Sequence, residues 1–382
     1  MITTETKTSV IVKRGYSCLP DEAQAVKEFY NQIYHPEMTA VVIFASSKLN
    51  LDKLGNELKQ AFTVPVIGCS TSGEITPDGY REGSLTGFSL TSEKLKVLTY
   101  NINPLDNLNT SQIQDIGTSV KQHLSEEQKK DANAKAFGLF LIDGLSVMEE
   151  IVIANLYSAL GNIPLIGGSA GDDIAFKKTC IYSDGQFISN MATVTLIITS
   201  LPFETFKIQH FTPTDKKLVI TQAIPSLRVV KEINGKPAAW EYARLIGLKI
   251  DELEPMVFSK YPVMLKIGGE YYVRSIQKTN DDGSLTFFCA IDEGLVLTLS
   301  KSSDLVSHLE SSLADISQKV PNPQLIIGFE CILRRLEVIE KDLASDVGKI
   351  MKRHNVVGFH TYGEQYNSIH VNQTFTGVVI GS

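Results

Sequence analysis

One phrase occurs three times along the chain, and this repetition constrains the fold more than any other feature. The copies are residues 65–75, PVIGCSTSGEI, residues 164–174, PLIGGSAGDDI, and residues 356–366, VVGFHTYGEQY. Each copy joins an apolar run to a glycine, a short turn, a second glycine and an acidic residue. Self-similarity at long spacing usually means that one structural unit is used repeatedly.

The text around each copy predicts what that unit contains. A short apolar run and then a stretch with helical spacing precede each copy, and a second apolar run follows it. Such runs are typical of strands buried on both faces, and i, i+3, i+4 spacing is typical of an amphipathic helix. The unit is therefore a strand, a helix, a strand and a glycine turn. The helical stretches cover residues 49–62, 147–160 and 333–350, and the following strands cover 85–90, 191–199 and 374–380.

The length of 382 residues suits two domains, and 43% hydrophobic residues are ordinary for a globular protein. We expect an α/β (α+β) fold with layered mixed sheets. The first domain is expected at residues 10–200 and the second at residues 201–382, with residues 201–236 as a proline-containing crossing segment. Within the second domain, Asn234-Gly235 predicts a turn between a strand and a short helix, and residues 271–290 predict a hairpin.

Composition also excludes some classes of protein. Apolar stretches fall short of the roughly 18–20 residues of a membrane helix, and the first 18 residues lack the apolar core of a secretory signal. The five cysteines are widely spread, which favours reduced thiols in a cytoplasmic protein. A net charge of −7 without a basic run makes nucleic acid an unexpected partner.

Residues 167–171, GGSAG, fit the G-x-S-x-G pattern that presents a nucleophilic serine, here Ser169, on a strand-to-helix turn. The text after Ser169 has no helical period, so a backbone role for the glycines is favoured over a serine hydrolase. The repeated acids Glu74, Asp172 and Glu364 either accept hydrogen bonds from turn amides or bind a metal or polar ligand, and the first role is favoured.

Among the seven histidines, His210 is unusual because it lies between apolar neighbours at the predicted domain crossing. A lone imidazole in such a setting can be an axial haem ligand, which needs no partner motif. From the residues alone, a structural histidine in the core is the favoured reading.

The chain resembles the FIST family of sensory proteins. The resemblance rests on the three repeated phrases, on FECILRR at residues 329–335, and on the closing stretch through VNQTFTG at residues 371–377. The middle of the chain, from HFTPTDKK at residue 210 to IDEGLVLTL at residue 299, is similar to the haem-binding, nitric-oxide-sensing FIST proteins of bacteria.

This resemblance implies a cytosolic sensor without enzymatic activity that holds haem b and binds nitric oxide. It implies that His210 is the proximal iron ligand, with His370 as the second choice, and that an arginine holds the haem propionates. The arginine candidates are Arg228, Arg244 and Arg274. It also implies output through a separate partner, such as a histidine kinase or a cyclic-di-GMP enzyme. The alternative is a haem-free FIST sensor that binds a small metabolite, such as an amino acid, in a cleft between domains.

Overall fold

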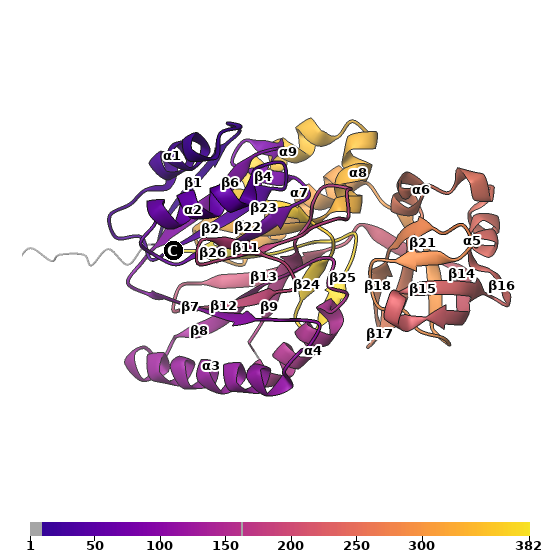
Figure 1. The fold of residues 1–382 in the computed structure, drawn as a ribbon, viewed down its shortest axis with the longest axis horizontal. Helices are drawn as coiled ribbons and strands as arrows, with labels where there is room; N and C mark the ends of the chain where they lie inside the picture. The colour runs from indigo at the N-terminus through magenta and orange to yellow at the C-terminus, as the bar shows by residue number, and fades with distance from the viewer. Residues whose placement is uncertain (1–9, 162) are drawn as a thin grey trace, which may run out of the picture.

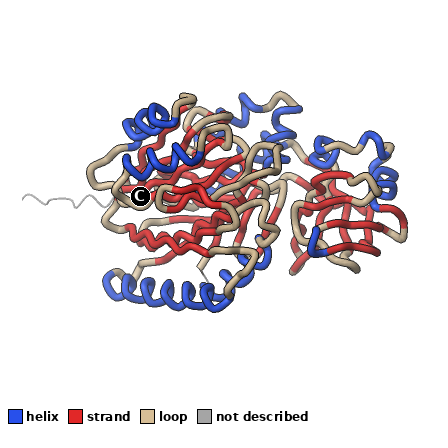
Figure 2. The backbone as a smooth tube through the Cα atoms, viewed as in Figure 1, coloured by secondary structure: helices blue, strands red, loops and turns tan. Residues whose placement is uncertain are grey.

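The computed structural model describes residues 10–161 and 163–382. The first nine residues, which belong to the stretch expected to lack a secretory signal, lie outside the described residues. The fold is mixed α/β, as the sequence predicts, with four sheets (Figures 1 and 2).

Three of the sheets are built to one plan. In spatial order the first contains β1 (Ile11–Ser17), β6 (Leu85–Thr91), β2 (Ala40–Ser46), β3 (Val66–Thr71), β10 (Ile181–Ser183) and β11 (Gln186–Ile188). The second contains β7 (Leu95–Ile102), β12 (Ala192–Thr199), β8 (Lys135–Ile142), β9 (Leu165–Ser169), β24 (Glu364–Tyr366) and β25 (Ile369–Val371). The third contains β13 (Phe203–Ile208), β26 (Phe375–Gly381), β22 (Pro323–Cys331), β23 (Val356–Thr361), β4 (Glu74–Thr76) and β5 (Gly79–Arg81). Each sheet has one parallel pair, β2–β3, β8–β9 or β22–β23.

In each of these three sheets, the last two strands come from a different repeat. The hairpin β4–β5 of the first repeat pairs with β23 of the third, and the hairpin β24–β25 of the third pairs with β9 of the second. The hairpin β10–β11 of the second repeat pairs with β3 of the first, which closes the cycle. The three repeats are therefore joined by mutual exchange of hairpins.

Helices cover the outer face of each of these sheets, and the inner faces share one core. The helices are α1 (Glu22–Ile33), α2 (Leu51–Ala61), α3 (Thr110–Lys130), α4 (Glu149–Leu160), α7 (Leu305–Gln318), α8 (Ile332–Glu340) and α9 (Ala344–Arg353). Phe44, Phe137 and Phe329, one from each repeat, pack into the common core. Every residue of β2 is buried because both faces of its sheet are covered.

The fourth sheet belongs to an insert in the third repeat, between β13 and α7. We call residues 211–302 the insert, and residues 10–210 with 303–382 the body. The insert contains β14 (Phe211–Ile224), β15 (Val229–Ile233), β16 (Lys236–Pro237), β17 (Val263–Ile267), β18 (Glu270–Arg274), β19 (Ile276–Thr279), β20 (Leu285–Phe287), β21 (Val296–Ser302), α5 (Ala238–Ile246) and α6 (Pro255–Lys260). It has its own apolar core and lies beside the body (Figure 1).

Several predicted elements are present and three details differ. The turn Asn234-Gly235 is confirmed, since both residues have positive φ, at 52° and 70°. The predicted helix at 333–350 is broken into α8 and α9 at Asp342, whose φ is 54°. In the middle copy, a loop separates β9 from its hairpin at β10, whereas the other two copies turn at once. The predicted hairpin at 271–290 forms from β19 and β20, because β18 pairs with β17 instead.

The predicted boundary between residues 200 and 201 falls between β12 and β13, where the second repeat ends. The predicted crossing segment, residues 201–236, contains β13, β14 and β15. How the chain divides into independently folding domains stays a prediction.

Candidate functional site

His210 lies at the neck between body and insert, directly after β13. Its carbonyl oxygen accepts from the backbone nitrogen of Ser303 at 2.8 Å and from the Ser303 hydroxyl at 2.7 Å, so the two crossing strands are tied together. Its ring is buried between two charged groups of α8. Arg334 lies 2.8 Å from Nδ1, and Glu337 lies 2.9 Å from Nε2.

This setting does not fit an iron ligand. Both ring nitrogens of His210 are already occupied, and the side chain has 0% exposure. Burial lowers the pKa of His210 to about 4, with Arg334 lowering it further and Glu337 opposing, so the ring is neutral. It then accepts from Arg334 at Nδ1 and donates to Glu337 from Nε2. The hydrogen bonds of His210 to Arg334 and Glu337 therefore connect the neck to α8.

The three predicted propionate partners do not share one place. Arg244 pairs with Glu241 on the surface of α5, and its side chain is 52% exposed. Arg228 and Arg274 both lie at the face where the insert meets the body. Their charges act on the same imidazole, that of His370.

Arg228 joins the insert to the start of α4. Its guanidinium contacts Glu149 at 2.7 Å and Glu150 at 2.5 Å, and it donates to the carbonyl of Phe288 at 2.5 Å. The second carboxylate oxygen of Glu150 accepts from the backbone of Ala290 at 2.5 Å. Burial raises the pKa of Glu149 to about 7, against the opposing charge of Arg228. These groups form a buried ionic bridge between the two parts.

Next to this bridge lies a group of buried polar side chains that we call the junction cluster. Its members from the insert are Arg274 and Ser275, and its members from the body are Gln365, His370, Asn372 and Gln373. Gln373 follows Asn372 in the chain and donates to the carbonyl of Ser259 in the insert at 3.0 Å. Arg274 donates to the carbonyl of His370 at 3.0 Å, and Asn372 accepts from the backbone of Ser275 at 3.3 Å. The Gln365 amide contacts Nδ1 of His370 at 2.8 Å.

Each member of the junction cluster carries one buried polar atom without a hydrogen-bond partner among the described residues. These atoms are Arg274 Nε, Ser275 Oγ, Gln365 Oε1, His370 Nε2, Asn372 Nδ2 and Gln373 Oε1. Buried polar groups are nearly always partnered in folded proteins, so such a concentration at one place calls for an explanation. Burial lowers the pKa of His370 to about 4, so its ring is neutral at physiological pH.

The place of the cluster in the fold also favours ligand binding. Strand β9 ends at Ser169, and the preceding parallel strand β8 leads to the start of α4. The cluster lies at this edge because Gln365 donates to Ser169 at 3.2 Å. In α/β sheets, ligands bind outside the carboxyl ends of parallel strands.

Ser169 lacks the setting of a nucleophile. It is fully buried at the end of β9, and the chain continues into a loop and then into β10. A nucleophile elbow needs a helix at that point. Among the residues that the structure describes, no cluster of His, Cys, Asp or Glu could hold a metal ion.

The repeated acids accept hydrogen bonds from the chain around them. Glu74 accepts from the Thr71 hydroxyl at 2.5 Å and from the Ser84 backbone at 3.0 Å. Glu364 repeats this pattern with Thr361 at 2.5 Å and the Thr374 backbone at 3.1 Å. Burial raises the pKa of Glu74 to about 7 and that of Glu364 to about 8. Asp172 instead accepts from three backbone amides of its loop, those of Phe176, Lys177 and Lys178.

Comparison with known proteins now defines the class. Residues 39–236 match the FIST N domain and residues 238–367 match the FIST C domain, so the chain belongs to the FIST family. The boundary between these two matches falls inside the insert. One relative of this chain is Uncharacterized protein MJ1623 of Methanocaldococcus jannaschii, and the two sequences are 24% identical over 388 positions. The match covers 89% of this chain and 73% of that protein. Family membership supports a sensory role in signal transduction.

No helix in residues 10–161 or 163–382 has both the length and the apolar character needed to cross a bilayer.

Sequence reasoning missed most of the junction cluster. Arg274 and His370 were candidates, but as haem contacts, and Gln365, Asn372 and Gln373 were not singled out. One signal was available: Asn372-Gln373-Thr374 is a polar run directly before a mostly apolar strand. Glu149 and Glu150 gave no signal, because acids in the first turn of a helix are common.

Proposed function

We propose that this FIST protein is a haem-free sensor that binds a small metabolite in the junction cluster. The observation that carries the proposal is the set of six buried, unpartnered polar atoms shared between insert and body. Each such atom costs free energy on the order of 1–3 kcal/mol unless something completes its hydrogen bonds. A small polar ligand would complete several of them at once.

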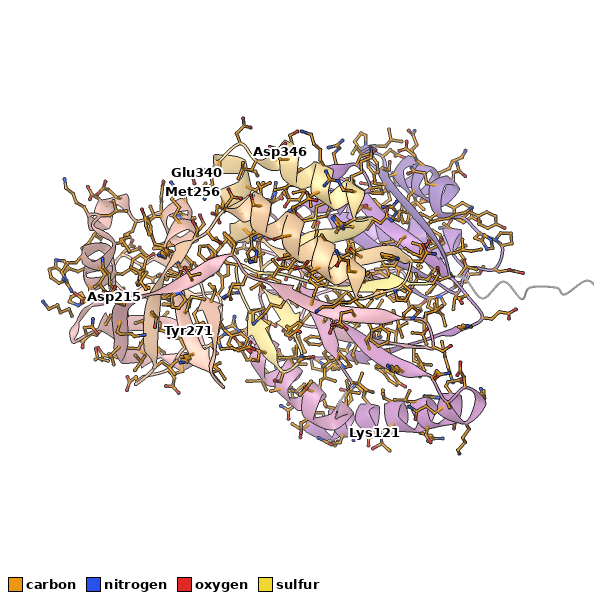
Figure 3. The ribbon with its side chains drawn as sticks, turned by 180° about the vertical axis from the view of Figure 1, so that it is seen from behind. Lys121, Asp215, Met256, Tyr271, Glu340 and Asp346 are labelled. Atoms are coloured by element: carbon orange, nitrogen blue, oxygen red, sulfur yellow. The ribbon has the colours of Figure 1, made fainter. Side chains whose placement is uncertain are left out.

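The response would be a change in how the insert sits on the body. The neck at His210 and Ser303 is narrow. Beside it the two parts meet through an apolar cluster, in which Phe288 of the insert packs against Leu333 and Tyr362 of the body, and through ionic and polar contacts. They include Lys260 of α6 with Glu340 of α8 at 2.5 Å. Figure 3 shows Glu340 beside Met256 of α6. A ligand held by both parts would favour the arrangement in which both sets of donors reach it.

We further propose that the output passes to a separate signalling protein, such as a histidine kinase or a cyclic-di-GMP enzyme. This part of the proposal comes from the resemblance to FIST sensors. A pull-down with the purified partner, with and without ligand, would test it.

Native mass spectrometry tests ligand binding directly. The full chain is incubated with the common amino acids and short hydroxy acids at millimolar concentration, and one small molecule is expected to bind each chain. Asn372→Leu removes a donor of the junction cluster and should weaken binding roughly tenfold or more. Asn56→Leu, the same change on the exposed face of α2, should bind as the parent does. Equal binding by both variants would locate the ligand elsewhere, and binding of nothing would contradict the proposal.

The haem hypothesis makes a different prediction, so the two can be separated. Reconstitution with haem b and absorption spectroscopy should give no stoichiometric Soret band if the proposal is correct. A Soret band that His210→Ala abolishes and His370→Ala retains would overturn it in favour of the haem and nitric oxide sensor.

A further inference from the structure

Arg274 differs from the other buried arginines of the body and insert. Arg228 pairs with Glu149 and Glu150, Arg334 pairs with Glu330, and Arg335 pairs with Glu82. Arg274 is only 6% exposed, yet its guanidinium has no carboxylate partner among the described residues. Its hydrogen bond goes to the carbonyl of His370, and its Nε has no partner. A buried cation without an anion is strongly unfavourable.

The atoms around Arg274 are mostly donors. The Gln365 amide nitrogen faces Nδ1 of His370, so the neutral ring carries its proton on Nε2, which is unpartnered. Asn372 uses its oxygen for the Ser275 backbone, which leaves its amide nitrogen as a free donor. With the Ser275 hydroxyl and Arg274 Nε, four donors are available. An ionised carboxylate accepts about four hydrogen bonds.

The neighbouring charges favour the ligand with the smaller negative charge. Arg228 is in direct contact with Glu149 and Glu150, whereas Arg274 contacts no carboxylate among the described residues. The two arginines and the two glutamates together carry no net charge, so the glutamates would repel a dianionic phosphate more strongly than a singly charged carboxylate. A carboxylate would give Arg274 the direct ion pair that it lacks.

We propose that the ligand of the junction cluster carries a carboxylate group, that Arg274 is its anchor, and that Ser275, His370 and Asn372 complete its hydrogen bonds. This inference rests on the proposed function and specifies the chemical class of its ligand. The carboxylate would bridge Arg274 of the insert and His370 of the body. Binding would therefore favour the arrangement in which both parts contact the ligand.

The experiment compares each acid with its own uncharged amide. Thermal unfolding of the full chain is followed with acetate, lactate or succinate, with acetamide, lactamide or succinamide, and with phosphate, at constant ionic strength. At saturation, at least one carboxylate should raise the midpoint by roughly 3–6 °C, and its amide should not. Arg274→Met should abolish the rise, whereas Arg244→Met, the same change at an arginine whose side chain is 52% exposed, should retain it.

The outcomes separate this inference from the proposed function. If an amide raises the midpoint as much as its acid, the carboxylate assignment falls and the junction site stands. If only phosphate acts, the carboxylate is likewise overturned. If no carboxylate shifts the midpoint of the parent, the inference falls whatever the variants do. The acid–amide comparison uses the parent protein, so it holds even if Arg274→Met does not fold.

Discussion

Two glycines at the same position of the repeated phrase are required for different physical reasons. Gly73 has a φ of 111°, in the region that favours glycine. Gly363 has no such φ; a Cβ there would lie 2.1 Å from Cε1 of His370 and 2.5 Å from Nε2. The repeated phrase predicts at both positions a backbone conformation that is hostile to side chains. This is confirmed at Gly73 and is wrong at Gly363, where the ring of His370, a member of the junction cluster, occupies the space instead.

Gly363→Ala should therefore destabilise the protein by about 2 kcal/mol or more, because the buried ring of His370 must move. Gly235→Ala is the matched control, since Gly235 has a φ of 70° with nothing within 4 Å of its Cβ position. It should cost about 1 kcal/mol through backbone strain alone. Chemical denaturation measures both, and equal losses would show that the contact with His370 is unimportant.

His210 predicts a particular pH dependence. Its pKa in the folded protein, about 4, lies below that of an unfolded histidine, about 6.5. The unfolded chain therefore binds more protons in this window, and stability is full above pH 6.5 and falls as the pH drops toward 4. His210→Gln removes this titration, so the free energy of unfolding that is lost on lowering the pH should be smaller by on the order of 1–3 kcal/mol.

The measurement is the free energy of unfolding from pH 7 to pH 4, by urea denaturation. His123→Gln, on the partly exposed face of α3, is the control and should follow the parent. Identical slopes for the parent and His210→Gln would mean that burial beside Arg334 does not hold the ring neutral.

At the scale of elements, the first turn of α4 carries two acidic side chains whose charges are balanced by an arginine of the insert. Glu149 and Glu150 are both largely buried and share Arg228, which is contributed by the short turn before β15. Removing Arg228 leaves two buried acids without a cation, which is far more costly than removing the whole bridge.

Arg228→Met should accordingly destabilise the protein by about 3–5 kcal/mol. Arg353→Met, at the exposed pair with Glu310, is the control and should cost less than about 1 kcal/mol. Adding Glu149→Gln to Arg228→Met should recover part of the loss, because one buried charge is then gone. Calorimetry of the four proteins is the measurement, and a loss with Arg228→Met no larger than that of the control would contradict the bridge.

The sequence predicted these elements well where the pattern is local. Runs such as residues 40–46 and 192–199 are strands because all their residues are apolar or small, and both faces are covered. The break at Asp342 was missed because apolar spacing continues across it from α8 to α9. The junction cluster was missed because its members, 274–275 and 365–373, meet only after a hairpin crosses to another sheet.

At the scale of the whole molecule, the body and the insert each have a core of their own, and the chain passes between them at one neck. A smaller apolar cluster, in which Phe288 of the insert packs against Leu333 and Tyr362 of the body, lies between the two parts. Phe211 and Ser302 pair in register at the start of β14 and the end of β21. The ends of the insert therefore lie side by side, as in domains that tolerate removal or replacement.

Replacing residues 212–301 by a short Asn-Gly turn should leave a body that folds. We expect native-like circular dichroism and a single cooperative transition at a lower midpoint, because the acids of α4 become solvated when Arg228 is lost. The full chain is the control. A truncated body without a cooperative transition would show that the three exchanged sheets depend on the insert.

The cyclic exchange of hairpins has a consequence for the order of events on the ribosome. The third sheet contains the hairpin β4–β5, which belongs to the first repeat. It also contains β26, the last strand in the sequence, which lies between β13 and β22. The first repeat must therefore wait, with its hairpin unpaired, until some three hundred residues more have been made. Such long-range pairing slows folding and leaves strand edges exposed meanwhile. The hairpin β4–β5 therefore stays without its partner strand until the third repeat has been made.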